Sequence, residues 1–264
     1  MPRLKITEAD RGTDTGGGDF LEALARGLRV LQAFDRERRQ LTLSDVARHV
    51  DLPRASVRRA LHTLVRLGFA ETDGRMFRLT PRVLTLANAY LLSNAISDII
   101  QPALERLSAE VGEACSAAVR DGDDVIWVAH AAPNRVLNVG ASIGFRIPAV
   151  ASALGRVFLA ELGDQELDAF LARVTPEKLT PHTETDRAVL RRAIVQVRRD
   201  GYALVDQEVE AGFHSIAVPL RRADGSVIAS LNIGVPGNRG TEDTLTRLLP
   251  RLKALAIELQ AQMI

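Results

Sequence analysis

The sequence predicts an α+β fold, in which a basic helical unit with a small hairpin is followed by a larger unit of strands and helices. Three observations support this prediction. The length of 264 residues exceeds one average domain, so two domains are expected. Apolar residues recur at helical spacing between residues 20 and 67. Short alternating apolar runs bounded by turn residues occupy much of residues 114–235.

The chain begins with a segment that has no periodic pattern. Residues 1–18 are polar and Gly-rich, which predicts a disordered tail. Asp19 lies three residues before Glu22 and ahead of leucines at helical spacing, so we expect it to cap the first helix in a capping-box arrangement.

Two further helices and a hairpin follow. Thr42 is predicted to cap a helix over 43–50. Pro53 suits the first turn of a third, arginine-rich helix that ends at Gly68. Residues 69–80 contain two short apolar runs around an Asp-Gly pair, which is typical of a tight hairpin.

Three short helices and a hairpin predict a winged helix-turn-helix domain over residues 19–80. The segment from Phe20 to Thr80 has twelve arginines against seven acidic residues, a net +5 in a chain of net charge +1, which suits a nucleic-acid partner. The third helix of such a domain enters the major groove of double-stranded DNA; a merely solvated charged face is the alternative. The candidate DNA-binding residues are Thr42, Ser44, Arg54, Ala55, Ser56, Arg58, Arg59, His62, Arg75 and Arg78.

Residues 81–95 are the predicted linker between the domains. Pro81 begins a helix with one apolar side, on which Val83, Leu84 and Tyr90 lie. Its place between two independent domains favours packing against a partner helix in a dimer. Packing within its own domain is the alternative.

Residues 96–264 are the predicted second domain, a mixture of strands and helices. Its hairpin turn is the run DGDD, Asp121 to Asp124. Strands are predicted at 114–120, 125–131, 136–142, 201–206, 214–220 and 226–235, and helices at 98–111, from Ser152 onward, and at 164–172, 186–200 and 241–263.

Several classes of protein are disfavoured. Neither a membrane span nor a secretory signal is present, which predicts a cytoplasmic protein. Cys115 is the only cysteine, and we expect it to be a buried small residue. The five histidines lack metal-ligand spacing, so no metal site is expected. Ser215 and His214 suggest a hydrolase, but neighbours on a strand face opposite sides, and neither a G-x-S-x-G turn nor a phosphate loop is present. We therefore expect neither an enzyme nor a cofactor.

Three longer runs resemble a known family. The runs LARGLRVLQAFD, LTLSDVARHVDLPRASVRRALHTLVRLGFAE and GYALVDQEVEAGFHSIAVPL are similar to those of the IclR family of bacterial transcription regulators. The resemblance covers Phe20 to the C-terminus. Within the family it is greatest to regulators of protocatechuate, 4-hydroxybenzoate and β-ketoadipate catabolism, where GYALVDQE occurs in similar form.

The resemblance implies a set of functional parts. They are a winged helix-turn-helix that binds operator DNA, a linker helix used in dimerisation, and a GAF-like domain that binds a small organic acid effector. Family members form homodimers and often tetramers. They activate or repress a catabolic operon, and RNA polymerase is a further partner of an activator.

The resemblance also places an effector pocket. Ser152, Ala153 and Leu154 begin a helix whose free amides suit a carboxylate. Val205 and Ser215 fall where relatives contact carboxylates. The full candidate set is Trp127, Asn138, Arg146, Ser152, Ala153, Leu154, Val205, Phe213, His214, Ser215 and Asn232, with core packing as the alternative for Trp127.

Two departures from the pattern concern the effector. The run GFHSIAVP has Phe213 and His214 where related regulators read leucine and arginine, and His130 stands where arginine is common. Histidine offers a carboxylate one donor where arginine offers a permanently charged fork. We therefore expect an effector with fewer carboxylates or a bulkier apolar part. A DNA-binding regulator without an effector remains the main alternative.

Overall fold

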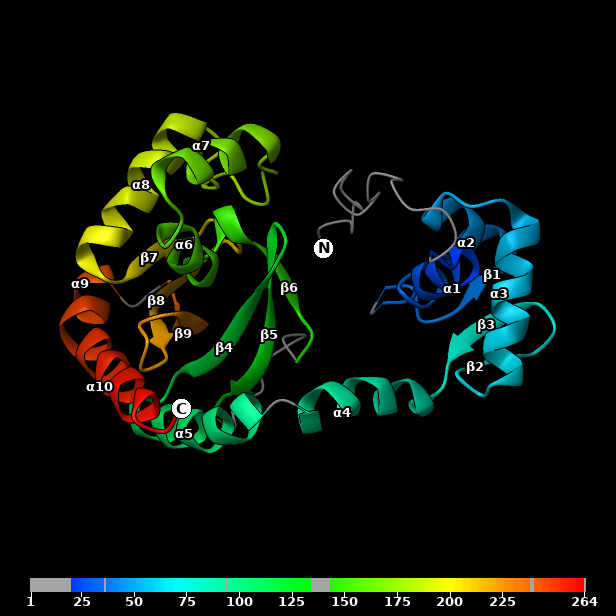
Figure 1. Cartoon of the computed structure of the whole chain (residues 1–264), viewed down its shortest axis with the longest axis horizontal. Helices are drawn as coiled ribbons and strands as arrows, with labels where there is room; N and C mark the ends of the chain where they lie inside the picture. Colours follow the sequence, from blue (N-terminus) through cyan, green and yellow to red (C-terminus); the bar gives the residue numbers. More distant parts are fainter. Residues whose placement is uncertain (1–19, 36, 94, 134–142, 238–239, 264) are drawn as a thin grey trace. The chain divides into compact units, whose positions relative to one another are not determined.

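The computed structural model describes residues 20–35, 37–93, 95–133, 143–237 and 240–263. By its contacts the chain divides into two compact units, Arg3–Ser93 and Asn94–Ile264, and the division falls within the predicted linker. Each unit contains helices and strands, so the α+β prediction is confirmed (Figure 1). The predicted tail, residues 1–18, and its neighbour Asp19 lie outside the described residues.

The first unit is a three-helix bundle with a small antiparallel sheet. Its sheet has the order β1-β3-β2, so the predicted hairpin is present as the pair β2 and β3. The elements are α1 (Glu22–Leu31), β1 (Leu41–Thr42), α2 (Leu43–Val50), α3 (Arg54–Arg66), β2 (Ala70–Thr72) and β3 (Met76–Leu79).

Local sequence explains how α2 begins. Thr42 Oγ1 accepts a hydrogen bond from the Asp45 amide at 3.2 Å, so the predicted cap is present, and with Asp45 it forms a full capping box. Leu21 occupies the N-cap position of α1. The predicted cap, Asp19, lies outside the described residues.

The core of this unit lies between the helices and the sheet. Val57 and Leu61 on α3 are fully buried against Val30 of α1, Val46 of α2 and Phe77 of β3. Because this spacing turns one side of α3 inward, the arginines on its other side remain in solvent.

The segment after the hairpin is helical. A 3₁₀ turn (Pro81–Val83) leads into α4 (Leu84–Ser93), and α5 (Ala95–Val111) follows, beginning three residues earlier than predicted. Leu84, Leu86 and Tyr90 on α4 are exposed by 69, 49 and 45% within this single chain.

The second unit is built on a six-stranded antiparallel sheet with the order β6-β5-β4-β9-β8-β7. The predicted strand at 136–142 lies outside the described residues. The strands are β4 (Ala114–Asp121), β5 (Asp124–Ala131), β6 (Arg146–Pro148), β7 (Ala203–Asp206), β8 (Phe213–Arg221) and β9 (Val227–Pro236).

Helices cover both faces of this sheet and enclose two apolar cores. One core lies under α5 and α10 (Leu249–Gln260), and the other lies under α6, α7 and α8 (Figure 1). A short 3₁₀ turn (Ala149–Ala151) precedes α6 (Ala153–Ala160), and α7 (Asp164–Arg173) and α8 (Arg187–Asp200) follow. The predicted final helix is instead three successive pieces: α9 (Thr241–Asp243), a π-helical turn (Thr244–Leu248) and α10.

The state of Cys115 and the length of the helices bear on two classes of protein, those with a reactive thiol and those that span a membrane. Cys115 is fully buried in the core under α5, and burial raises the pKa of its thiol to about 12, so a reactive thiolate is strongly disfavoured. Among the residues that the structure describes, no helix is both long and apolar enough to cross a membrane.

Candidate functional site

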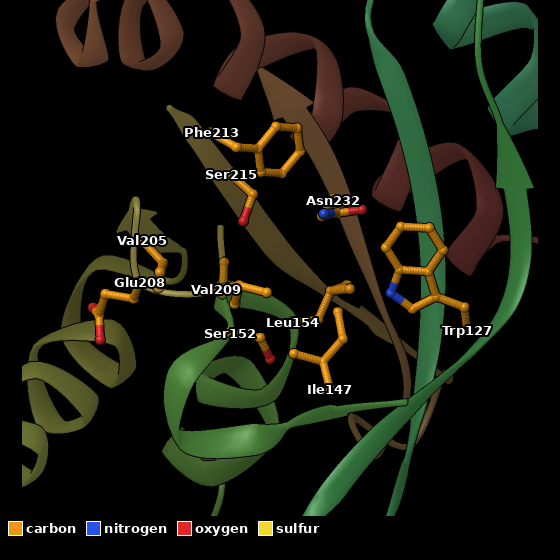
Figure 2. A pocket seen from close by; sticks show the side chains of 11 residues that line it. Trp127, Ile147, Ser152, Leu154, Val205, Glu208, Val209, Phe213, Ser215 and Asn232 are labelled. Carbon is orange, nitrogen blue, oxygen red and sulfur yellow. The ribbon is translucent and has the colours of Figure 1, made fainter. Parts of the chain in front are cut away.

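A hollow opens on the side of the sheet that α6 covers. Its empty space is about 370 Å³, including open solvent at the mouth. Figure 2 shows Glu208 at one end of the hollow and Trp127 at the other, with Asn232 on the sheet between them. Eight predicted effector residues line it, namely Trp127, Ser152, Ala153, Leu154, Val205, Phe213, Ser215 and Asn232.

The start of α6 forms one wall of this pocket. Ser152 is the N-cap, and its Oγ accepts a hydrogen bond from the Gly155 amide at 3.0 Å. The amides of Ala153 and Leu154, in the first turn, have no carbonyl four residues earlier in the helix to bind. These amides and the positive end of the helix dipole favour an anionic group in the pocket.

Close packing holds α6 in this place. A Cβ atom on Gly155 would lie 2.2 Å from Cα and 2.3 Å from the carbonyl oxygen of Ala149. Only glycine lets the backbone of α6 lie so close to the preceding 3₁₀ turn. The pocket wall therefore depends on a residue that does not itself contact the hollow.

Strand β8 forms the opposite wall. Phe213 and Ser215 are two residues apart and so face the same side of the sheet. The ring of Phe213 lies over Gly234 of β9, where an added Cβ would approach to 2.3 Å. Glycine at this position makes room for the bulky side chain of Phe213.

The structure corrects the prediction for His214. This residue faces the other side of the sheet, where it is 2% exposed and its Nε2 lies 2.8 Å from Thr244 Oγ1. The physical reason is the alternation of side chains along a strand, which puts His214 opposite to Phe213 and Ser215. His214 is therefore not part of the pocket lining, and it cannot activate Ser215.

Arg146 also lies outside the lining. Its Nη2 and Nε donate hydrogen bonds to Asp124 at 3.0 and 3.2 Å, and its Nη1 forms an ion pair with Asp121. Pairing of β5 with β6 brings the guanidinium to these carboxylates of the hairpin turn. Asn138 lies outside the described residues.

Three lining residues, Ile147, Glu208 and Val209, were absent from the predicted set. Glu208 is buried, and its carboxylate accepts hydrogen bonds from Arg156 Nη2 at 2.7 Å and from the Glu184 amide at 3.0 Å. This ion pair neutralises the charge of Glu208 beside the pocket. Ile147 was missed because the sequence placed its neighbour Arg146 in the pocket, and side-chain alternation then turned Ile147 away from it.

Trp127 both lines the pocket and packs against other rings. It stacks on His130 with ring centroids 5.0 Å apart and meets Phe145 edge to face at 5.4 Å. Burial lowers the pKa of His130, whose Nδ1 lies 2.9 Å from Ser116 Oγ. A neutral ring is therefore favoured behind Trp127. Among the described residues, no group of three potential ligands could hold a metal ion.

The predicted DNA-binding residues lie on the first unit. On α3, Arg54, Ala55, Arg58, Arg59 and His62 are exposed and Ser56 is half-buried. Among the described residues, no hydrogen bond or ion pair engages the side chains of Arg54, Arg58, Arg59 and His62, which leaves them available to a partner.

The other predicted DNA-binding residues are less available to DNA, because most of them are half-buried or already bound to other groups of the protein. Thr42 Oγ1 is occupied by its capping box, and Ser44 beside it is half-buried. On the hairpin, Arg75 is exposed near the turn, whereas Arg78 donates a hydrogen bond to Glu71 at 2.5 Å. The exposed face of α3 is therefore the stronger part of the candidate nucleic-acid interface.

Comparisons with known proteins agree with this architecture. Residues 23–74 match the IclR helix-turn-helix domain, and residues 88–261 match the C-terminal domain of bacterial IclR regulators. The chain is 42% identical over 251 residues to the Pca regulon regulatory protein of Pseudomonas putida, covering 94% of this chain and 86% of that protein.

Two solved structures are also similar. A transcriptional regulator of Rhodococcus sp. RHA1 is 44% identical with a TM-score of 0.80, covering 92% of this chain and 98% of that one. An IclR homologue of Microbacterium hydrocarbonoxydans, solved with 4-hydroxybenzoate, is 29% identical with a TM-score of 0.75, covering 90% of this chain and 98% of that one. The chain thus belongs to the IclR family of bacterial transcriptional regulators, which bind DNA and are not enzymes.

Proposed function

We propose that this regulator controls an operon for catabolism of aromatic compounds and that it senses a small organic acid in the pocket beside α6. The observation that carries the proposal is the pocket itself, where apolar side chains surround the first amides of a helix. A homologue was solved with 4-hydroxybenzoate, an acid of this kind. The protein would act in the cytoplasm, where operator DNA is accessible.

The pocket offers one site for an anion. The Ala153 and Leu154 amides lie at the start of α6, and the Ser215 hydroxyl lies on the facing strand. Together they can bind a carboxylate without a formal positive charge. The rest of an aromatic acid would lie against Leu154, Ile147 and Phe213.

A homodimer would bind the operator. The apolar side chains of α4 are exposed in the single chain, which supports the proposal that residues 81–95 pair with a second copy. Such a dimer would place two α3 helices in successive major grooves of a repeated or palindromic operator. The effector would change operator affinity, or contact with RNA polymerase, through its different affinity for two states of the dimer. Two dimers could form a tetramer.

The test of this proposal is the response of the full chain to 4-hydroxybenzoate. At a ligand concentration about 100 times Kd, binding should stabilise the native state by about 2.7 kcal/mol. Calorimetry should show this as a higher unfolding temperature of the second unit, and Ser215→Leu, which fills the pocket, should abolish the shift. If 4-hydroxybenzoate, protocatechuate and β-ketoadipate all leave the unfolding temperature unchanged, a regulator without an effector is the better description.

The exposed face of α3 yields a second expected result. Arg54→Ala combined with Arg59→Ala should lower the preference for operator over random DNA by at least about tenfold, because a bidentate arginine–guanine contact contributes roughly 1–3 kcal/mol of discrimination. Fluorescence anisotropy with both DNAs measures the ratio. Arg66→Ala, an exposed arginine in the last turn of the same helix, is the matched control and should leave the ratio unchanged. Equal ratios for the double variant and the native chain would contradict base contact by these residues.

A further inference from the structure

Two polar atoms of the pocket lining are buried and have no hydrogen-bond partner in the described part of the chain. They are Nε1 of Trp127, a donor, and Oδ1 of Asn232, an acceptor. Asn232 is only 5% exposed. Native proteins leave few buried polar atoms unpaired, so a pair of them at one pocket indicates a group that is supplied from outside.

The sheet brings the two side chains to one place. Trp127 on β5 pairs with Ala118, and Asn232 on β9 pairs with Ser116, so they flank β4 at positions two residues apart. Positions two apart share a face of the sheet. Strands on either side of a third lie about 10 Å apart. Figure 2 shows both side chains on the sheet side of the same hollow.

One chemical group satisfies both atoms. A hydroxyl oxygen can accept a hydrogen bond from Trp127 Nε1 while its proton is donated to Asn232 Oδ1. A ketone can only accept, which leaves Oδ1 unpaired. A carboxylate also only accepts, and its charge would lie against the lone pairs of Oδ1.

The charges around the pocket also favour an effector with a single carboxylate. The buried guanidinium of Arg156 is committed to Glu208 at 2.7 Å, and Arg146 is paired with Asp121 and Asp124. Within the described lining no unpaired cation remains to neutralise a second carboxylate, and an uncompensated charge is costly to bury. Of the lining that the structure describes, the start of α6 is the part that suits an anion.

We propose that Trp127 and Asn232 recognise a neutral hydroxyl group of the effector, so that the pocket selects a hydroxylated aromatic monocarboxylate over a dicarboxylate. This inference rests on the proposed function, because it requires the pocket to be the effector site. To the proposed function it adds two specificity-determining residues, Trp127 and Asn232, and the hydroxyl group of the effector that they recognise.

Isothermal titration of the full chain with 4-hydroxybenzoate, benzoate and adipate tests it. The native chain should bind 4-hydroxybenzoate roughly 10- to 100-fold more tightly than benzoate, which leaves both atoms unpaired. Trp127→Phe keeps an aromatic ring, although a smaller one, and removes the donor. Asn232→Leu keeps the approximate shape and removes the acceptor. Each variant should bring the ratio of the two affinities close to one, mainly by weakening 4-hydroxybenzoate. Tyr202→Phe, which removes a ring hydroxyl that packs against the other core, is the matched control and should keep the native ratio.

The outcomes separate the two levels of the proposal. A native ratio near one, or a ratio that Trp127→Phe leaves unchanged, overturns hydroxyl recognition. Binding of adipate without binding of either aromatic acid also overturns it, while leaving the effector function in place. Failure of all three acids to bind overturns the inference, and if protocatechuate and β-ketoadipate also leave the unfolding temperature unchanged, the effector function falls with it. Unfolding curves of the two variants establish that each is folded under the conditions of the titration.

Discussion

Gly155→Ala should destabilise the second unit by about 3 kcal/mol or more, at the upper end of what overpacking costs. The added methyl group would lie 2.2 Å from Cα of Ala149, and every atom it meets there belongs to the backbone of Ala149. A side chain could rotate away, but here α6 must move as a whole relative to the preceding turn. Because α6 is buried along its entire length, that movement disturbs the core under it.

Urea denaturation followed by circular dichroism measures this effect, and effector titration measures its local consequence. Displacement of the first turn of α6 should also weaken binding of 4-hydroxybenzoate. Gly163→Ala is the matched control, because its Cβ would meet only Glu166 Oε2 at 3.6 Å, and it should change the stability by less than about 1 kcal/mol. A Gly155→Ala variant as stable as this control would show that the close approach of α6 to Ala149 is not required.

Arg156→Met should cost about 3–5 kcal/mol, because it leaves the buried carboxylate of Glu208 without its cation. Arg156 also donates to the Val150 carbonyl at 2.8 Å, which adds to the loss. Adding Glu208→Gln to Arg156→Met should recover much of the stability, since the double variant buries no unpaired charge while the amide oxygen can still accept from Glu184.

The double-mutant cycle, measured by urea denaturation, isolates the coupling between the two charges. Arg106→Met is the matched control. Its ion pair with Glu258 is formed at 2.6 Å, but both side chains are more than half exposed, so its loss should cost only about 0.2–1 kcal/mol. If Arg156→Met were as mild as this control, the buried pair would not be a structural element of the pocket.

Features set by neighbouring residues could be predicted from the sequence. The capping box of Thr42 and the cap of Ser152 each join groups three residues apart, and both are present. The inward and outward sides of α3 follow from its periodicity alone. The first residue of α1, Glu22, was harder to predict, because a helical pattern alone does not fix where the first turn begins.

Features set by distant residues could not be predicted in this way. Arg156 and Glu208 are 52 positions apart, and nothing in a helix pattern distinguishes a buried arginine from an exposed one. Arg146 pairs with the carboxylates of Asp124 and Asp121, which are 22 and 25 positions away in the sequence. Only the pairing of the strands brings these groups together. The error at His214 was avoidable, because Ser215 and Phe213 already assigned the pocket side of that strand.

The alternation along β8 has a consequence for building biosensors from this regulator. A library that varies Phe213 and Ser215 changes the lining of the pocket beside α6, whereas a library at His214 changes its contact with Thr244. Under the proposed function, the first library would alter which compound triggers a reporter, and the second would alter thermal stability and expression. Ligand preference can thus be selected at Phe213 and Ser215, and stability and expression can be selected separately at the adjacent His214.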